Sequence, residues 1–273
     1  MAGDRQVGQN GSTSKEKKLK RKQVLERMKA VDELIKSAYD ESDTDPLSAF
    51  APFRSYDRNG LCIRLESASG DKLSLPIKRY IQNLLKLNME KQYGCEWPSE
   101  EKIKRREMVA PEARYLFALE PQAVCATQGS GQQEKEMDDS CTVESKSAIV
   151  GFVHYRFTVE EDVPVLYVYE LQLEPRVQGK GLGKFLMQLI ELIAHKKHMS
   201  AVVLTVQTEN LTAMRFYLSK LRYNISSISP SQVGVEKNYE ILCKAFDIEA
   251  KERLESGCTT YLGIPKVKIA QNN

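Results

Sequence analysis

The segment from Val163 to Ala194 constrains the fold most, because three distinct local patterns follow one another within it. Residues 163–173 are rich in β-branched and aromatic side chains and predict a strand. The turn that follows, residues 178–184, contains three glycines. Apolar residues then recur at helical spacing, namely Leu182, Phe185, Leu186, Leu189, Ile190 and Ile193. A glycine turn that opens a helix presents free backbone N–H groups at its positive end, which suits a phosphate.

Two common phosphate motifs do not fit this turn. A P-loop requires Ser or Thr after its lysine, but Lys184 is followed by Phe185, and the glycine spacing also differs. The dinucleotide pattern requires a third glycine where Lys184 stands. What remains is Gln178-x-x-Gly181-x-Gly183. A glycine turn that binds no ligand is the alternative, because short motifs have many false matches.

The rest of the chain predicts an α/β fold of mixed type. Alternating or buried-type runs predict strands at 61–65, 114–119, 148–157, 201–206 and 239–246. Helical spacing predicts helices at 15–38, 75–93, 99–106, 181–194 and 211–220. Residues 122–146 are too polar to bury a core and predict a flexible insertion. We therefore expect an arm at 1–45, a domain at 46–248 and a tail at 249–273.

Composition limits the functions that the chain can have. An apolar fraction of 41% over 273 residues is sufficient for a folded core, and a net charge of +3 does not by itself indicate nucleic-acid binding. The charge is local, since eight of the fifteen residues from Lys15 to Lys29 are Lys or Arg. This stretch predicts a nuclear-import signal or a contact with nucleosomes, and a solvated helix is the alternative.

Two further expectations concern location and metals. The sequence has no long apolar run and no hydrophobic stretch near its start, so we expect no membrane span and no secretory signal. The expected location is the nucleus and cytoplasm. Six cysteines without a C-x-x-C pair, together with three histidines, predict reduced thiols and no metal site.

The glycine turn resembles the pyrophosphate loop of the GCN5-related N-acetyltransferases, or GNAT family, which bind acetyl-CoA. A second element supports the resemblance, because Asn210-Leu211-Thr212-Ala213-Met214-Arg215-Phe216-Tyr217 is similar to the N-x-x-A-x-x-F-Y segment of that family. The resemblance covers roughly residues 60–246. It implies a central mixed, mostly antiparallel sheet flanked by helices.

Further segments resemble the branch of this family that acetylates the N-termini of histones. They are the KEKK start, Asp45-Pro46-Leu47, Arg58-Asn59-Gly60-Leu61, Asn88-Met89, Trp97 with 105–108, Tyr169-Glu170-Leu171-Gln172-Leu173-Glu174 and Tyr239-Glu240-Ile241-Leu242. The resemblance implies that acetyl passes directly from acetyl-CoA to the N-terminal serine of histones of the 4 and 2A types. Histone tails would be the partners, with nucleosome contact through the basic arm.

The resemblance also implies roles for individual residues. The catalytic pair would be Glu170, as base, and Tyr217, as proton donor to the leaving thiolate. Peptide-binding residues would be Tyr93, Trp97, Tyr169, Glu170 and Tyr239. Residues that bind acetyl-CoA would be Leu171, Gln172, Leu173, Arg176, Gln178, Gly179, Lys180, Gly181, Leu182, Gly183, Lys184, Thr205 and Asn210.

The sequence itself supports a functional role best for Glu170. A charged side chain without a function inside an apolar, tyrosine-rich strand would lower the stability of the folded protein. The alternative for Glu170 is a surface glutamate without a catalytic role. The alternative for Tyr217 is that it only packs beside Phe216. Thr158 stands where the family pattern has an aspartate, so Glu160 or Glu161 is expected to supply the acidic contact. Two other functions remain open: a lysine or broader N-terminal acetyltransferase, and a chromatin adaptor that binds acetyl-CoA without catalysis.

Overall fold

The computed structural model describes residues 14–40, 45–121 and 147–255. The strands are β1 (Ser55–Arg58), β2 (Leu61–Ser69), β3 (Arg114–Pro121), β4 (Ser147–Glu160), β5 (Val163–Leu173), β6 (Ala201–Gln207), β7 (Asn224–Ile225) and β8 (Tyr239–Ala245). The helices are α1 (Ser14–Ala38), α2 (Leu75–Tyr93), α3 (Trp97–Glu107), α4 (Leu182–Lys196), α5 (Leu211–Arg215), α6 (Pro230–Val233) and α7 (Ile248–Leu254).

The eight strands form one sheet in the order β1-β2-β3-β4-β5-β6-β8-β7. All neighbouring pairs are antiparallel except β5 and β6, which run parallel. The connection between these two parallel strands is the helix α4, as a parallel crossover requires. The expected mixed, mostly antiparallel sheet is therefore confirmed.

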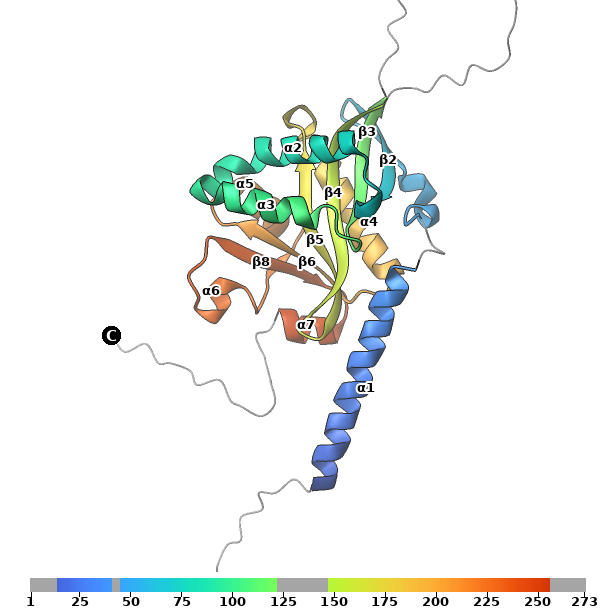
Figure 1. The fold of residues 1–273 in the computed structure, drawn as a ribbon, viewed down its shortest axis with the longest axis vertical. Helices are drawn as coiled ribbons and strands as arrows, with labels where there is room; N and C mark the ends of the chain where they lie inside the picture. The colour runs from blue at the N-terminus through green and yellow to red at the C-terminus, as the bar shows by residue number, and fades with distance from the viewer. Residues whose placement is uncertain (1–13, 41–44, 122–146, 256–273) are drawn as a thin grey trace, which may run out of the picture.

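Helices cover both faces of this sheet, as Figure 1 shows. Alternate residues of β3 point to opposite faces: Tyr115 and Phe117 pack with α2 and α3, whereas Leu116 and Ala118 pack with the α4 side. Helix α4 is amphipathic and buries seven side chains, among them Leu186 and Ile190. The two cores fix α3 and the start of α4 relative to the same strands.

Helix α1 extends from the body of the protein (Figure 1). Its basic half is exposed, but Ala38 is buried at its end and the hydroxyl of Tyr39 donates to the backbone oxygen of Phe157. The predicted arm helix is thus confirmed, and only its last turn packs on the sheet. None of the helices in the described ranges combines the length and apolar character that a membrane span needs.

The parallel strands β5 and β6 separate before they end. Their pairing runs only from Val165↔Ala201 to Val168↔Leu204. Beyond these positions β5 continues to Leu173 beside β4 alone, and β6 continues to Gln207 beside β8 alone. The sheet therefore opens into a gap between the two strands.

Most predicted helices and strands are confirmed, and two helices differ from the prediction. The segment expected as one helix at 211–220 is an α-helical turn followed by a π-helical turn, Phe216–Lys220. Helix α7 lies across the expected start of the tail and buries Ala250 and Leu254. The insertion expected at 122–146 lies outside the described residues.

Candidate active site

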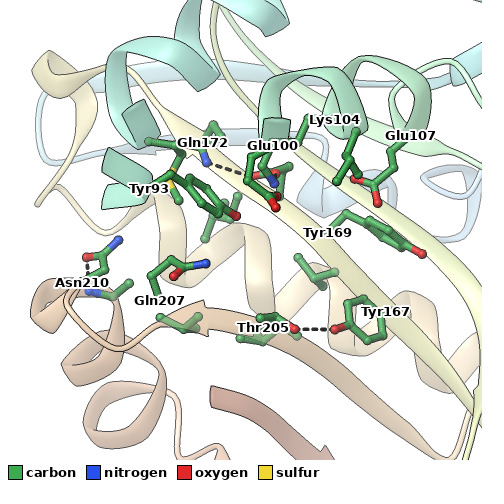
Figure 2. A pocket seen from close by; sticks show the side chains of 18 of the residues that line it. Tyr93, Glu100, Lys104, Glu107, Tyr167, Tyr169, Gln172, Thr205, Gln207 and Asn210 are labelled. Atoms are coloured by element: carbon green, nitrogen blue, oxygen red, sulfur yellow. Dashed lines mark hydrogen bonds and ion pairs between the residues drawn. The ribbon is translucent and has the colours of Figure 1, made fainter. Parts of the chain in front are cut away.

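A cavity of about 400 Å³ lies at the opening between β5 and β6. Its walls come from five places: the end of α2, one face of α3, the end of β4, the ends of β5 and β6, and the segment from Asn210 to Tyr217. Figure 2 shows the polar side chains of these elements around it. Opened strands beneath a helical cover form a concave site, which is where ligands bind in mixed sheets.

Glu170 lies on β5 in the wall of this cavity and is only 8% exposed. One carboxylate oxygen forms an ion pair with the ammonium group of Lys104 from α3. The other oxygen accepts a hydrogen bond from Gln172 Nε2 at 2.8 Å. The sequence-predicted base is therefore a buried carboxylate that borders the cavity, with one protein contact to each oxygen, and the surface alternative is wrong.

Aromatic side chains line the cavity, but not all of those expected. Tyr93, Tyr167 and Tyr169 border it, and burial raises the pKa of each hydroxyl, to about 12 for Tyr167. Trp97 does not border it, because it is the first residue of α3 and is buried in the core beneath, with its ring centroid 6.0 Å from that of Tyr93. Trp97, expected among the peptide-binding residues, therefore lies in the core and not in the cavity wall. Tyr239 lies at the start of β8, outside the lining residues.

Tyr217 borders the cavity from the opposite side to α3 and is 7% exposed. Burial raises the pKa of its hydroxyl, with a further contribution from the charge of Glu170. The hydroxyl therefore stays protonated near neutral pH and can donate a proton. It lies in the π-helical turn, a feature often found at functional sites.

Thr205 and Asn210 also border the cavity. The hydroxyl of Thr205 is 2.5 Å from that of Tyr167, so this hydrogen bond joins β6 to β5 at the point where pairing ends. The side chain of Asn210 caps α5 by accepting a hydrogen bond from the backbone N–H of Ala213 at 3.1 Å. Both residues shape the opening between the strands.

The glycine turn lies between β5 and α4, and two residues far away in sequence hold it. Gly181 is the N-cap of α4 with a left-handed φ of 88°, which favours glycine. The backbone oxygen of the preceding Lys180 accepts hydrogen bonds from the hydroxyl of Tyr56 at 2.6 Å and from Asn59 Nδ2 at 2.9 Å. The first N–H groups of α4 have no partner within the helix, as in any helix start.

The other predicted cofactor residues surround this turn. Leu171, Gln172 and Leu173 form the end of β5, whose side toward β6 has no strand partner in the described residues. Gln178 Nε2 donates to the backbone oxygen of Leu173 at 2.9 Å. Arg176 is exposed and forms ion pairs with Glu120 and Glu174. The remaining members are Gly179, Lys180, Leu182, Gly183 and Lys184, all within the turn or the first turn of α4.

The acidic side chains of the cavity are only partly those expected. Glu160 borders it, whereas Thr158 and Glu161 do not. Burial raises the pKa of Glu160, and repulsion from Glu161 adds to the effect. Burial also raises the pKa of Glu107 on α3, despite the nearby cations Lys104 and Arg156. Two carboxylates whose charged form a bound cation would stabilise thus border the same cavity.

Sequence reasoning missed the contribution of α3. Glu100, Ile103, Lys104 and Glu107 all border the cavity. Their spacing of three, one and three residues places them on one face of a helix, and this is the signal that could have found them. Gln207 was missed as well: it is buried beside the cavity, and its Oε1 has no hydrogen-bond partner. Such an atom can accept a hydrogen bond from a ligand.

The sequence of residues 90–221 matches the profile of the Acetyltransferase (GNAT) family. The matched range contains the Glu170 strand, the glycine turn and the Asn210–Tyr217 segment, and it begins within α2. Every element that borders the cavity therefore contributes residues to the matched range.

Solved structures with a similar fold include three acetyltransferases. One from Thermoplasma acidophilum, crystallised with coenzyme A, is 17% identical, and the alignment covers 67% of this chain and 99% of that one with a TM-score of 0.43. Naa50 of Arabidopsis thaliana, bound to a bisubstrate analogue, is 16% identical over 67% and 99% of the chains, with a TM-score of 0.40. NAA60 of the same plant is 11% identical over 67% and 99%, with a TM-score of 0.42. By its sequence match, the part of the chain from residue 90 to residue 221 is similar to the Acetyltransferase (GNAT) family.

Proposed function

We propose that this chain is an acetyl-CoA-dependent N-terminal acetyltransferase that acts on histones of the 4 and 2A types, like N-alpha-acetyltransferase D. The observation that carries the proposal is the position of Glu170, a carboxylate in the cavity wall at the opening of the sheet. It lies on the strand that leads to the glycine turn, and acidic and aromatic groups border the same cavity. The two ends of the opening suit the two substrates.

The glycine turn suits the pyrophosphate of acetyl-CoA. Helix α4 has fifteen residues, and its N-terminal N–H groups and dipole favour an anion there. The end of β5 leads from the turn to Glu170, and its side toward β6 has no strand partner in the described residues. A backbone N–H of Leu171 to Leu173 on that side can donate to the thioester oxygen as its negative charge develops.

The transfer moves three protons. An α-amino group has a pKa of about 7.7 to 8.0, so much of it is protonated near neutral pH, and this form must lose a proton before it can attack. In the proposed step Glu170 accepts that proton, directly or through water. The amine nitrogen then bonds to the thioester carbon, the carbon–sulfur bond breaks, and the electron pair remains on sulfur. Tyr217 donates a proton to the leaving thiolate, and the second proton, which nitrogen loses as the amide forms, returns to Tyr217 through water.

Glu160 and Glu107, the acidic side chains that border the cavity, favour a peptide substrate with a basic residue. Histone ends of the 4 and 2A types begin Ser-Gly-Arg-Gly, which combines a small first residue with an arginine at the third position. Glu160 and Glu107 both have pKa values raised by burial, so a bound guanidinium group would relieve the cost of their charge. Neither forms an ion pair with another described residue. Tyr93 and Tyr169 narrow the space for the first residue.

A panel of peptides tests this function. Peptides beginning Ser-Gly-Arg-Gly should be acetylated far faster than peptides beginning Met-Asp or Ala-Ala, because the half-buried carboxylates of Glu160 and Glu107 stay unpaired when the wrong peptide binds. Product masses measured after incubation with acetyl-CoA give the relative rates. Comparable rates on all free N-termini would contradict histone selectivity and favour a general N-terminal enzyme.

We propose that the basic arm directs the protein to the nucleus and takes no part in catalysis. Six of the seven basic residues from Lys17 to Lys29 are exposed on α1, whereas Arg27 is half-buried and forms an ion pair with Glu249 of α7. None of the seven lines the cavity. Deleting residues 1–30 should therefore reduce nuclear accumulation and leave activity on short peptides unchanged. Fluorescence microscopy of the tagged truncation, with peptide assays on the same protein, measures both. An unchanged distribution would remove this role from the arm.

A further inference from the structure

The ion pair between Lys104 and Glu170 joins α3 to the opening of the sheet. The side chains are 12% and 9% exposed, so both charges are largely withdrawn from water. Withdrawing two charges costs several kcal/mol each, and a well-packed apolar pair is often as stable. Stability alone therefore does not account for a lysine at this position beside the cavity.

The second oxygen of Glu170 is held as firmly as the first. Gln172 Nε2 donates to it at 2.8 Å, and Asn88 Nδ2 of α2 donates to Gln172 Oε1 at 2.9 Å. The bond from Asn88 leaves the Gln172 side chain with its NH₂ group toward Glu170. The carboxylate is thus fixed from one side by α3 and from the other by α2, through residues of different elements.

Lys104 is itself held in one place. Its ammonium group lies 5.3 Å from the ring centroid of Tyr93, within the range of a cation–π contact. Burial disfavours its charge, but attraction to Glu170 and Tyr93 outweighs burial and raises its pKa. The side chain therefore remains a cation at all pH values at which an enzyme works, and it cannot act as the base.

We propose that Lys104 is a positioning residue for Glu170: together with Gln172 it holds the carboxylate in a single orientation for the acceptor amine. The inference rests on the proposed acetyl transfer. A carboxylate offers about four lone-pair positions, so the two protein contacts leave room for a third partner from the cavity.

The test is a set of variants assayed on a peptide beginning Ser-Gly-Arg-Gly. Lys104→Met should lower kcat/KM about 10-fold or more, while KM for acetyl-CoA changes by less than about twofold. Lys104→Arg keeps the charge and should retain most of the activity. Lys102→Met removes one exposed charge from the same helix and is the matched control, with activity like the wild type.

A double variant separates positioning from a structural role. In a Glu170→Gln background, adding Lys104→Met should change kcat/KM by less than about twofold, because the group that Lys104 positions is already gone. Equal losses in both backgrounds, or full activity of Lys104→Met, would overturn the proposal.

The outcomes also separate this inference from the proposed function. A wild-type protein that acetylates no free amine refutes the function itself, whereas an active wild type with an equally active Lys104→Met variant refutes only the role of Lys104. If Lys104→Met does not fold, Lys104→Gln, which keeps a hydrogen-bond donor, replaces it with the same expected changes. Thermal unfolding of each variant identifies such a case.

Discussion

Glu170 of β5 lies opposite His154 of β4, and the register between the strands shifts directly after this pair. The shift leaves Tyr169 as an extra residue on β5, and its ring stacks on that of His154 at 4.9 Å. A bulge of this kind bends a strand and changes the direction of its side chains. The candidate base and the aromatic wall beside it therefore both depend on the contact between β4 and β5.

The first prediction concerns His154, which is 3% exposed and whose Nε2 has no hydrogen-bond partner. Burial lowers its pKa from 6.5 to about 3, with smaller contributions from Arg156 and Lys104. The unfolded chain binds the proton more readily, so the folded protein loses stability as pH falls from 6.5 toward 3.

Replacing His154 with Phe keeps the stack of rings and removes the titration. Thermal unfolding of His154→Phe should therefore depend less steeply on pH than that of the wild type in this window, while acetyl transfer at neutral pH stays within about twofold. A large loss of activity at neutral pH in a folded variant would mean that His154 takes part in the chemistry.

The second prediction separates two glycines of the turn. A Cβ at Gly181 would lie 2.7 Å from the hydroxyl of Tyr56 and would impose a left-handed conformation on a larger residue, so Gly181→Val should lower both stability and acetyl-CoA affinity. A Cβ at Gly183 would lie 3.5 Å from the nearest atom, an ordinary contact.

Gly183→Ala is therefore the more informative variant. It should fold like the wild type and still lose affinity for acetyl-CoA, because the added methyl group would project toward Leu171 and Leu173 at the end of β5, where the proposed function places the cofactor. Calorimetric titration with acetyl-CoA, together with a melting curve, measures both properties. Wild-type affinity in Gly183→Ala would place the phosphates elsewhere.

The third prediction concerns Tyr217. Its raised pKa keeps the hydroxyl protonated, so it can serve as a proton donor up to high pH. Tyr217→Phe should lower kcat roughly 10- to 100-fold and leave KM for both substrates nearly unchanged. Steady-state kinetics measures the split. If kcat is unaffected, the thiolate takes its proton from another source and Tyr217 only packs beside Phe216.

The fourth prediction tests the acidic wall. Glu160→Gln and Glu107→Gln should each raise KM for a peptide with arginine at the third position about 10-fold, and have little effect when alanine stands there. Glu161→Gln is the matched control, because Glu161 neighbours Glu160 in sequence but does not border the cavity. A uniform effect on both peptides would assign these carboxylates to folding rather than to selectivity.

The strand, glycine turn and helix of residues 163–194 could be predicted because each has a strong local pattern. The edge strand β1 could not, since its four polar and aromatic residues show no periodicity and its Tyr56 acts through the distant Lys180. The resemblance implied a peptide-binding role for Trp97, but Trp97 is the first residue of α3 and its side chain is buried in the core, which only the tertiary structure shows.

The burial of Lys104 could not be predicted from the local sequence either. It stands in a short, highly charged helix, and such a pattern is typical of a solvated surface. Its burial depends on Glu170, which is 66 residues further along the chain. The separation of β5 from β6 is likewise a property of tertiary structure, because nothing in the two apolar strands indicates where their pairing ends.

In the proposed function, the cavity at the opening between β5 and β6 is the place where acetyl passes from acetyl-CoA to an α-amino group. The most direct measurement uses two peptides that begin Ser-Gly-Arg-Gly and contain an internal lysine, one with a free and one with a blocked N-terminus. After incubation with acetyl-CoA, fragmentation by mass spectrometry locates the acetyl group. We predict one acetyl group on the α-nitrogen of the free peptide and none on the blocked peptide, with the rate lowered about 100-fold or more by Glu170→Gln. Acetylation of the lysine in the blocked peptide, or an unchanged rate in Glu170→Gln, would contradict the account.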